Sequence, residues 1–438
     1  MIQLPQPSRP ARPRPLSGAD KLRRAYVLVA SFVGLALLFR AVPQLDEAMG
    51  DMHWDLNVDQ LTARAFLDGY NPFTRSGAVR SGLSLSGPAG TGHPPTTCFW
   101  FIPLARMSLH AAGAILAWTT ILLLLVELAT TFRLLRYPAP MASAWLVLCY
   151  VLSCSFMKYH VGVGQISGLI GFLYFVGWAA GRDGGDWLAG AALGVACTLK
   201  AFPGLMVVLF LVAMRWRAVL AAVLVYTTVA AYMTAQLGFA SWRFFLAQQA
   251  PVADLWMGSI QNQSIHGIVL RMFRPVCEWH GPVLRQATII SSVLGLLLVV
   301  AGVWLVRRIV RGGGFDLAYA LFVVLSMVTS QWTWEHYTVI YVLPVSILGS
   351  TLVAWWKARR HRAGVAAMLL LLAGIVGSWA ISMNTKVQLQ GEVHRGSSGL
   401  HLRLHVFDVL NWAPGLVLLA MLLVVCRWTD RARRSPAI

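Results

Sequence analysis

Charged residues are scarce in this sequence. They form 12% of its 438 residues, about half the share of an ordinary soluble domain, whereas hydrophobic residues form 57%. This composition excludes a soluble globular enzyme, and it equally excludes a disordered, coiled-coil or collagen-like chain. Apolar runs instead recur at close to the roughly 20 residues that are needed to cross a bilayer. They predict an all-α polytopic membrane protein embedded in a lipid bilayer.

Acidic residues are few even among the charged ones. The chain has 17 Asp and Glu against 36 Lys and Arg, which gives a net charge of +19. In a membrane protein such an excess first indicates cytoplasmic loops. Because no basic groove or base-stacking module accompanies it, we expect no nucleic-acid partner. The sequence also lacks a GxxxxGKS or GxxxxGKT phosphate loop, which argues against ATP-driven transport by this chain alone.

Cysteines are few and lie mostly in apolar runs. Only Cys277 falls in a long polar loop, so no disulfide framework or paired-cysteine metal site is predicted. The remaining five are Cys98, Cys149, Cys154, Cys197 and Cys426.

Twelve apolar segments can be drawn along the chain, and they predict about twelve transmembrane helices. They are residues 25–42, 95–104, 111–131, 142–157, 166–180, 187–212, 218–237, 287–306, 317–330, 337–355, 364–383 and 406–426. Eleven or thirteen crossings stay open, because segment 95–104 is short for a span.

A domain plan follows when the N-terminus is placed in the cytoplasm and the loops between successive segments are placed on alternating sides of the membrane. We expect a disordered basic cytoplasmic tail over residues 1–24, followed by an uncleaved signal anchor that opens a transmembrane domain over residues 25–426. A second basic tail follows at 427–438. The long polar segments 43–94, 238–286 and 384–405 fall on the outer face, where we expect the chemistry. In this arrangement Arg133 and Arg136 also fall outside, against the general rule that basic residues stay inside.

The first outer loop contains a candidate catalytic helix. Asp55 and Asp59 are one helical turn apart and share a face, while Trp54, Val58 and Leu61 recur on another, as in an amphipathic helix on a membrane surface. One of the two acids is a candidate general base. The competing interpretation is a solvated helix face, on which such acid pairs are ordinary.

Lys200 lies within an otherwise apolar segment. A charge there costs about 2.5 to 3.5 kcal/mol on insertion scales, so it needs an anion or a polar cavity. Pro203 follows it and breaks the helix. The alternative is a lysine that extends to the membrane interface.

Four further candidates occur in or near outer loops. One aromatic turn contains Trp334, Glu335 and His336. In the functional interpretation its Trp side chains wall a cavity and His336 binds phosphate or a sugar hydroxyl. The alternative is an interfacial aromatic belt. Asn262 is a sugar-type hydrogen-bonding residue. Arg271 and His93 are candidates for binding a lipid phosphate. Gln165, whose amide would enter a polar pocket, is with Trp334 and Glu335 a further candidate for binding the sugar or acceptor.

The order and spacing of these motifs resemble family 87 of the GT-C glycosyltransferases. The resemblance runs over residues 55–344 and rests on six features. They are Asp55 before a helix that ends in Gly-x-Asn-Pro-aromatic, a Pro-Pro start, Gly-Gln, Lys-x-x-Pro, Asn-x-Ser and Trp-x-His-Tyr.

The resemblance implies a function. Members are GT-C-type membrane enzymes that transfer a sugar, typically mannose or arabinofuranose, from a polyprenyl-phosphate carrier to a glycolipid or glycan acceptor on the extracytoplasmic side. It further implies a bacterial-type inner membrane, inversion by direct displacement, Asp55 as the base, and Lys200 and His336 at matching positions. Asp59 departs from the family pattern, so the two acids could share the role. No metal or other cofactor is obligatory, because the phosphate leaving group lies near fixed cations.

Three rival functions stay open. A transporter or lipid flippase has the same composition but predicts paired repeats, which we do not see. A polyprenyl-linked glycan ligase or polymerase would rely on Arg and His in a large outer loop instead of Asp55. A non-catalytic scaffold is the third rival, and carbohydrate transfer that is preserved after Asp55→Asn would favour the scaffold or the ligase.

Overall fold

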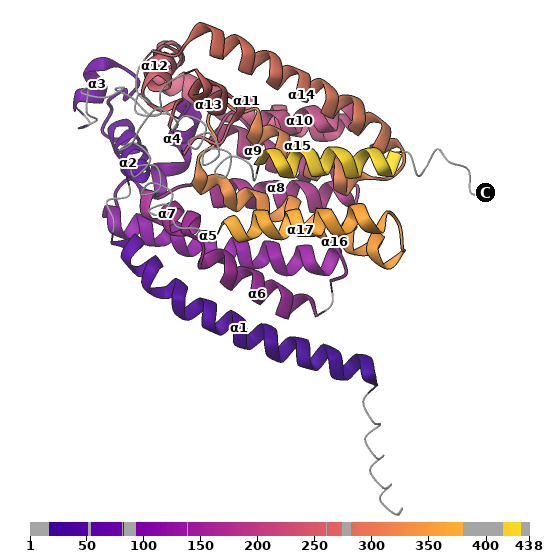
Figure 1. Cartoon of the computed structure of the whole chain (residues 1–438). Coiled ribbons are helices and arrows are strands. Elements are labelled where there is room, and N and C mark those ends of the chain that lie inside the picture. Colours follow the sequence, from indigo (N-terminus) through magenta and orange to yellow (C-terminus); the bar gives the residue numbers. More distant parts are fainter. Residues whose placement is uncertain are drawn as a thin grey trace, which may run out of the picture.

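The computed structural model of this protein describes residues 17–50, 54–80, 82, 93–137, 139–259, 261–273, 282–379 and 415–430. All regular secondary structure in these ranges is helical, apart from one isolated antiparallel bridge between Asn262 and Trp334. The expected all-α fold is therefore confirmed. Figure 1 shows most of the long helices running side by side along one axis of a single bundle.

The helix bounds follow the apolar segments of the sequence in most places. They are α1 (Gly18–Met49), α2 (Trp54–Leu67), α3 (Arg75–Arg80), α4 (Pro95–Phe101), η1 (Ile102–Leu104), α5 (Leu109–Leu134), α6 (Pro140–Leu152), α7 (Ser155–Val163), α8 (Ser167–Arg182), α9 (Asp186–Leu199), α10 (Gly204–Val212), α11 (Trp216–Leu237), α12 (Ala240–Trp256), α13 (Ile265–Met272), α14 (Arg285–Arg311), α15 (Phe315–Val328), η2 (Glu335–Tyr341), α16 (Val342–Lys357), α17 (Arg362–Ser378) and a last helix over residues 415–430.

Five elements are long and apolar enough to cross a membrane. They are α1, α5, α11, α14 and the continuous segment Glu335–Lys357, which joins η2 to α16. The pair α6 and α7 gives a sixth candidate, with a bend of 68° between its halves, and α9, α15 and α17 are apolar but shorter. The chain is a multi-pass membrane protein, while a count of twelve crossings stays a prediction.

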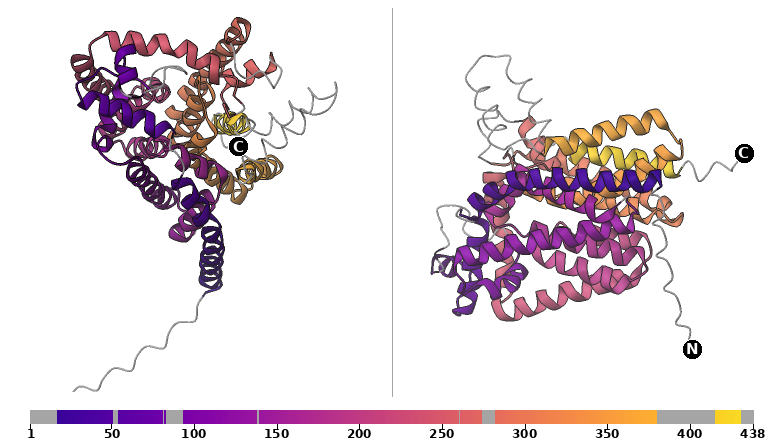
Figure 2. Two further views of the ribbon diagram at one scale, coloured as in Figure 1. Left: turned by 90° about the vertical axis from the view of Figure 1, so that its left-hand side faces the viewer. Right: turned by 90° about the horizontal axis from the view of Figure 1, so that it is seen from below.

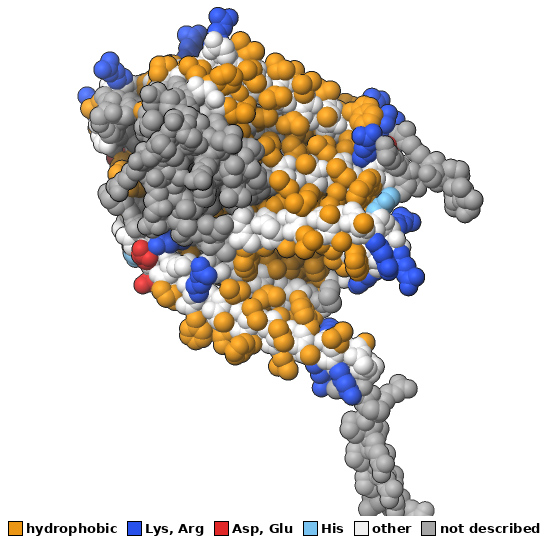
Figure 3. All heavy atoms as spheres, viewed as in Figure 1, with side chains coloured by type: hydrophobic (Ala, Val, Ile, Leu, Met, Phe, Trp, Pro, Cys, Tyr) orange, Lys and Arg blue, Asp and Glu red, His pale blue; other side chains and the backbone are white. Residues whose placement is uncertain are grey.

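An apolar surface surrounds the bundle. Large side chains such as Phe32, Phe39 and Leu370 are about three-quarters exposed, at 75%, 74% and 75%. Figure 3 shows hydrophobic side chains over most of the visible flank, with Lys and Arg gathered mainly toward its edges. Contiguous exposed apolar surface of this size is unfavourable in water and suits lipid chains.

The start of α1 differs from our expectation. Ser17 caps the helix by accepting a hydrogen bond from the backbone N–H of Asp20 at 3.2 Å. Lys21 and Arg24 therefore lie in the first turns of α1, where we expected a disordered tail over residues 1–24. Residues 1–16, the expected outer loop 384–405 and residues 431–438 lie outside the described residues.

The expected span over residues 95–104 is wrong. These residues form α4 and η1, only 7 and 3 residues long, which extend about 10–16 Å at the rise of 1.5–2 Å per residue. The hydrocarbon core is about 30 Å thick. Gln60 of α2 donates hydrogen bonds to the carbonyl oxygens of Leu104 and Met107 at 2.8 and 2.9 Å, so this short segment supports α2.

The expected span over residues 187–212 is instead a hairpin of two helices. The chain turns between α9 and α10 at residues 200–203, and Arg215, just after α10, forms an ion pair with Asp186 at the start of α9. Both free ends of the hairpin are thus together, and Lys200 lies at its tip. The break near Pro203 is as expected, but the chain reverses there instead of continuing across the membrane.

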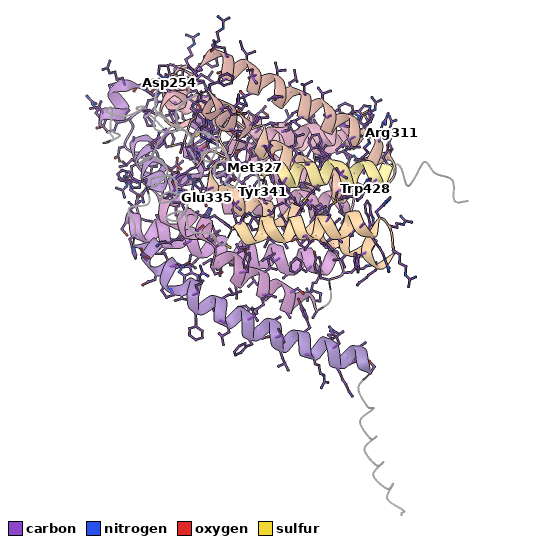
Figure 4. All side chains as sticks on the ribbon, viewed as in Figure 1. Asp254, Arg311, Met327, Glu335, Tyr341 and Trp428 are labelled. Carbon is purple, nitrogen blue, oxygen red and sulfur yellow. The ribbon has the colours of Figure 1, made fainter. Side chains whose placement is uncertain are left out.

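The position of Arg133 and Arg136 corrects the expected sidedness. Tyr26, near the start of α1, lies 2.8 Å from Ser143 near the start of α6, so the α5–α6 connection lies at the end of the bundle where α1 begins. Figure 2 shows the last described helix finishing at that same end. Figure 4 places Arg311 and Trp428 at this end and Asp254 and Glu335 toward the other. We call these the Arg311 end and the cavity end.

Small residues allow α9 and α11 to pack closely and in parallel. A Cβ atom on Gly190 would overlap the carbonyl oxygen of Ala218, and one on Gly194 would lie 2.7 Å from that of Ala222. Close approach of backbones at small residues is a general device for helix packing in membranes. It fixes the direction of α9 and hence the depth of Lys200.

Gly190→Val is expected to lower stability by about 1–3 kcal/mol, because the added side chain meets backbone instead of a movable side chain. Thermal unfolding of the detergent-solubilised protein measures the loss as a lower Tm. The matched control is Gly374→Ala in α17, where an added Cβ meets nothing within 4 Å, and its Tm should not fall. An unchanged Tm for the Gly190 variant would contradict the close contact.

Candidate active site

A cavity of about 580 Å³ lies among α2, α7, α12, the tip of the α9–α10 hairpin and η2. A volume of this size is typical of small-ligand sites. Seven of the predicted site residues line it, and three do not. Its polar and aromatic lining consists of Asp55, Asp59, His93, Tyr159, Gln165, Lys200, Phe202, Phe245, Gln249, Trp256, Gln261, Ser330, Gln331, Trp332, Trp334, His336 and Tyr337.

Helix α2 brings two carboxylates to the cavity. Asp55 and Asp59 are four residues apart and therefore lie on one face, as predicted. The alternative of a solvated helix face does not fit. Asp59 is only 5% exposed, and Thr62, which lies on the same polar face of the helix, is 2% exposed. Trp54 on the expected apolar face is instead 65% exposed. The polar face of α2 thus points into the protein. That α2 lies on a membrane surface stays a prediction.

The end of α2 is anchored to distant parts of the chain. Gly69, with a φ of 78°, takes the left-handed conformation that turns the chain after the helix. Asn71 then donates hydrogen bonds to the carbonyl oxygen of Leu237 at 2.6 Å and to Ser241 Oγ at 3.0 Å. The Gly-x-Asn-Pro sequence therefore ties α2 to α11 and α12.

A chain of hydrogen bonds joins Asp55 to Lys200 through Gln165. The Gln165 side-chain amide donates to Asp55 Oδ2, and its Oε1 accepts a hydrogen bond from Lys200 Nζ at 2.8 Å. Lys200 Nζ also donates to Tyr337 Oη at 2.6 Å. Gln165 reaches this position because Gly164 ends α7 with a φ of 69°. The structure thus gives Gln165 carboxylate and ammonium partners, where we expected sugar contacts.

Burial shifts the acidity of Asp55. Removal of its carboxylate from water raises the pKa above its usual value, and the neighbouring Asp59 charge acts in the same direction. His93, Lys200 and the Gln165 hydrogen bond oppose this shift. A carboxylate with a raised pKa is a stronger base than an exposed one while it stays ionised near neutral pH.

Asp59 pairs with His93. The two carboxylate oxygens lie 2.9 and 3.1 Å from His93 Nδ1, and Asp59 is nearly fully buried. The sequence reasoning named both residues but did not predict that they contact each other, because they are 34 residues apart in the sequence. A carboxylate in this position fixes the orientation of the imidazole ring.

His336 stands in the cavity wall beside Tyr337. Its ring is 3% exposed, and within the described residues neither ring nitrogen has a hydrogen-bond partner. The rings of Tyr159 and Tyr337 lie 5.3 and 4.8 Å away. Unsatisfied buried polar groups are costly, and a ligand in the cavity would supply the missing partner.

Three predicted site residues do not line the cavity. Asn262 uses its side chain to bind backbone groups, with Oδ1 accepting from Ser264 and Thr333 at 3.1 Å each. Arg271 Nη1 donates to the carbonyl oxygens of Ser259 and Asn262 at 2.5 and 3.0 Å. Glu335 is buried at 5% exposure behind the wall. Asn262 and Arg271 therefore support the cavity wall, where we expected contacts to sugar and phosphate.

Sequence reasoning missed several lining residues. Phe202 stacks on Tyr337 at 5.7 Å, and Gln249 and Trp256 come from α12. The sequence predicts a polar outer segment over residues 238–286, and α12 lies within it. The aromatic residue after His336 in the Trp-x-His-Tyr motif was the available signal for Tyr337.

Comparison with known proteins identifies the family. The sequence profile of glycosyltransferase family 87 matches residues 92–331. The polyprenol-phosphate-mannose-dependent alpha-(1-2)-phosphatidylinositol mannoside mannosyltransferase of Mycobacterium tuberculosis is 26% identical over 398 residues, or 86% of each chain. The protein of the same name from Mycolicibacterium smegmatis is 26% identical over 402 residues, which is 83% of this chain and 82% of that one. Because the profile covers more than half of the sequence, the chain belongs to glycosyltransferase family 87 and is a membrane glycosyltransferase.

Proposed function

We propose that the protein transfers mannose from a polyprenyl-phosphate carrier to a hydroxyl group of a glycolipid or glycan, with inversion at the anomeric carbon. The names of the two relatives support this donor, and the phosphatidylinositol mannoside in those names supports a glycolipid acceptor. The observation that carries the proposal is the Asp55 carboxylate in a cavity, bridged through Gln165 to the buried Lys200 ammonium.

The reaction is a direct displacement. The acceptor oxygen attacks the anomeric carbon from the face opposite the phosphate, and the bond between that carbon and the phosphate oxygen breaks. The electron pair of that bond leaves with the polyprenyl phosphate, and Asp55 takes the proton of the acceptor hydroxyl. Asp59 orients His93 and does not itself serve as the base, because its two oxygens already face the His93 ring.

Lys200, His93 and His336 form the proposed phosphate site. Lys200 is a buried point charge at the tip of the α9–α10 hairpin, and the two imidazole rings line the same cavity. Fixed donors of this kind stabilise the charge of a departing phosphate without reorganisation. We therefore propose a reaction in which no metal ion or other cofactor is obligatory.

We further propose twelve membrane crossings with the cavity on the extracytoplasmic side of a bacterial-type inner membrane. In this count the two arms of the α9–α10 hairpin, which run from the Arg215–Asp186 ion pair to the cavity and back, take the place of the α4 segment. Arg133 and Arg136 then join the basic residues of the Arg311 end, which supports a cytoplasmic location for that end.

Asp55→Asn is expected to lower mannose transfer by about 10²- to 10⁴-fold, the usual contribution of a positioned general base. Binding of the donor should stay near normal, since the carboxylate acts on the acceptor proton. The assay offers membranes with labelled polyprenyl-phosphate-mannose and native lipid. The matched control is Asp68→Asn, whose carboxylate is 44% exposed and pairs with Arg106. Equal transfer by wild type and the Asp55 variant would contradict the proposal.

Lys200→Met is expected to weaken donor binding, because the variant keeps the length of the side chain but removes the cation that faces the phosphate. We expect about a tenfold or larger rise in the KM for polyprenyl-phosphate-mannose, since hydrogen bonds to charged groups contribute about 1.5–3 kcal/mol. Lys158→Met is the control, because Lys158 pairs with Glu47 near the surface and does not line the cavity. An unchanged donor KM in the Lys200 variant would remove Lys200 from the phosphate site.

A further inference from the structure

Three rings form a row along one wall of the cavity. Trp332 and Trp334 stand just before η2, and His336 is the second residue of that helix. The rings of Trp332 and Trp334 lie 6.2 Å apart with 10° between their planes, and those of Trp334 and His336 lie 6.5 Å apart with 12°. We call Trp332, Trp334 and His336 the aromatic ladder.

The backbone behind the ladder is fixed by the segment that precedes α13. The N–H of Gln263 donates to the Thr333 carbonyl oxygen at 2.6 Å, and Ser264 Oγ donates to the Gln331 carbonyl oxygen at 3.1 Å. Asn262 accepts from the N–H of Thr333 on the same segment. The rings are therefore held in place before a ligand arrives, which lowers the entropic cost of binding.

The ladder leads away from the charged residues of the site. His336 contacts Tyr337, whose hydroxyl accepts a hydrogen bond from Lys200. Trp334 lies next to His336 on the other side, and Trp332 lies beyond Trp334. Trp256 of α12 meets Trp334 edge-on at 6.3 Å. The other polar residues of this part of the lining carry uncharged hydrogen-bonding groups; they are Tyr159, Gln249, Gln261, Ser330 and Gln331.

This combination fits a neutral, hydroxyl-rich ring. Aromatic faces carry partial negative charge and attract weakly positive C–H groups, while side-chain amides both donate and accept hydrogen bonds to hydroxyls. An isoprenoid chain would make no hydrogen bonds with these side chains, and a phosphate finds its cation at Lys200. We propose that Trp332 and Trp334 of the aromatic ladder, together with Trp256, bind the sugar part of the acceptor, with its reactive hydroxyl directed toward Asp55.

The proposal rests on the proposed function, and its test separates acceptor from donor. Trp332→Ala is expected to raise the KM for a soluble alkyl dimannoside acceptor by about 3- to 10-fold, in line with the energy of aromatic contacts, while the donor KM stays unchanged. Trp334→Phe keeps a ring and should retain most of the affinity that Trp334→Ala loses. Trp118→Ala, a lipid-exposed tryptophan of α5 that is 62% exposed, is the matched control.

A second measurement does not depend on turnover. Titration of the purified wild-type protein with the alkyl dimannoside should change its tryptophan fluorescence, and the change should be smaller in Trp332→Ala but not in Trp118→Ala. An unchanged acceptor KM and an unaltered fluorescence titration in Trp332→Ala would overturn the ladder assignment. Wild-type transfer that is lost in Asp55→Asn would then still support the proposed function. If the wild type transfers no mannose, the proposed function fails, and the fluorescence titration still decides on the ladder.

Discussion

The hydrogen-bonded connection from Asp55 through Gln165 to Lys200 is the interaction on which the site depends. An isolated buried ammonium or carboxylate in a membrane protein is costly, and each here compensates the other through one neutral amide. The amide also keeps the two charges apart, and in the proposed mechanism this leaves the lysine to face the donor phosphate and the carboxylate to take a proton. In a direct ion pair, the Asp55 carboxylate and the Lys200 ammonium would each be taken up by the other and would not be free to contact a substrate.

Interruptions of the helices create this arrangement. Gln165 follows the left-handed Gly164 at the end of α7, Lys200 follows α9 at the tip of a hairpin, and Tyr337 lies in the short η2 before α16. Within a bilayer, irregular backbone is tolerated only where protein or a polar cavity satisfies its polar groups. The three helix breaks therefore meet at one cavity. The polar side chains that stand at these breaks, Gln165, Lys200 and Tyr337, all line it.

The sequence predicted the parts of the site that are coded by local pattern. A pair of acids one turn apart on α2, a lysine in an apolar segment before Pro203, and the Trp-x-His-Tyr turn all lie where the spacing indicated. It did not predict the partners of these residues. The Asp59–His93 contact, and the use of Asn262 and Arg271 as backbone anchors, depend on long-range packing that no local pattern encodes.

Hydropathy also misjudged two segments. Residues 95–104 are apolar but too few to cross a bilayer, and residues 187–212 are long enough for one span but fold back as two helices. In the proposed topology these two errors offset each other in the count of crossings, and between them they reverse the side on which Arg133 and Arg136 fall. Composition measures how apolar a segment is, whereas its direction is decided by contacts such as the packing of Gly190 on α11.

The acid side of the pH profile of kcat, for wild type and Gln165→Leu, tests the central claim most directly. The base must be ionised, and burial raises the pKa of Asp55, so transfer should decline on acidification with a midpoint above the range of an exposed aspartate. Loss of the Gln165 hydrogen bond, which lowers that pKa, should move the midpoint further up. A profile without an acid limb, or the same midpoint in both proteins, would contradict the account.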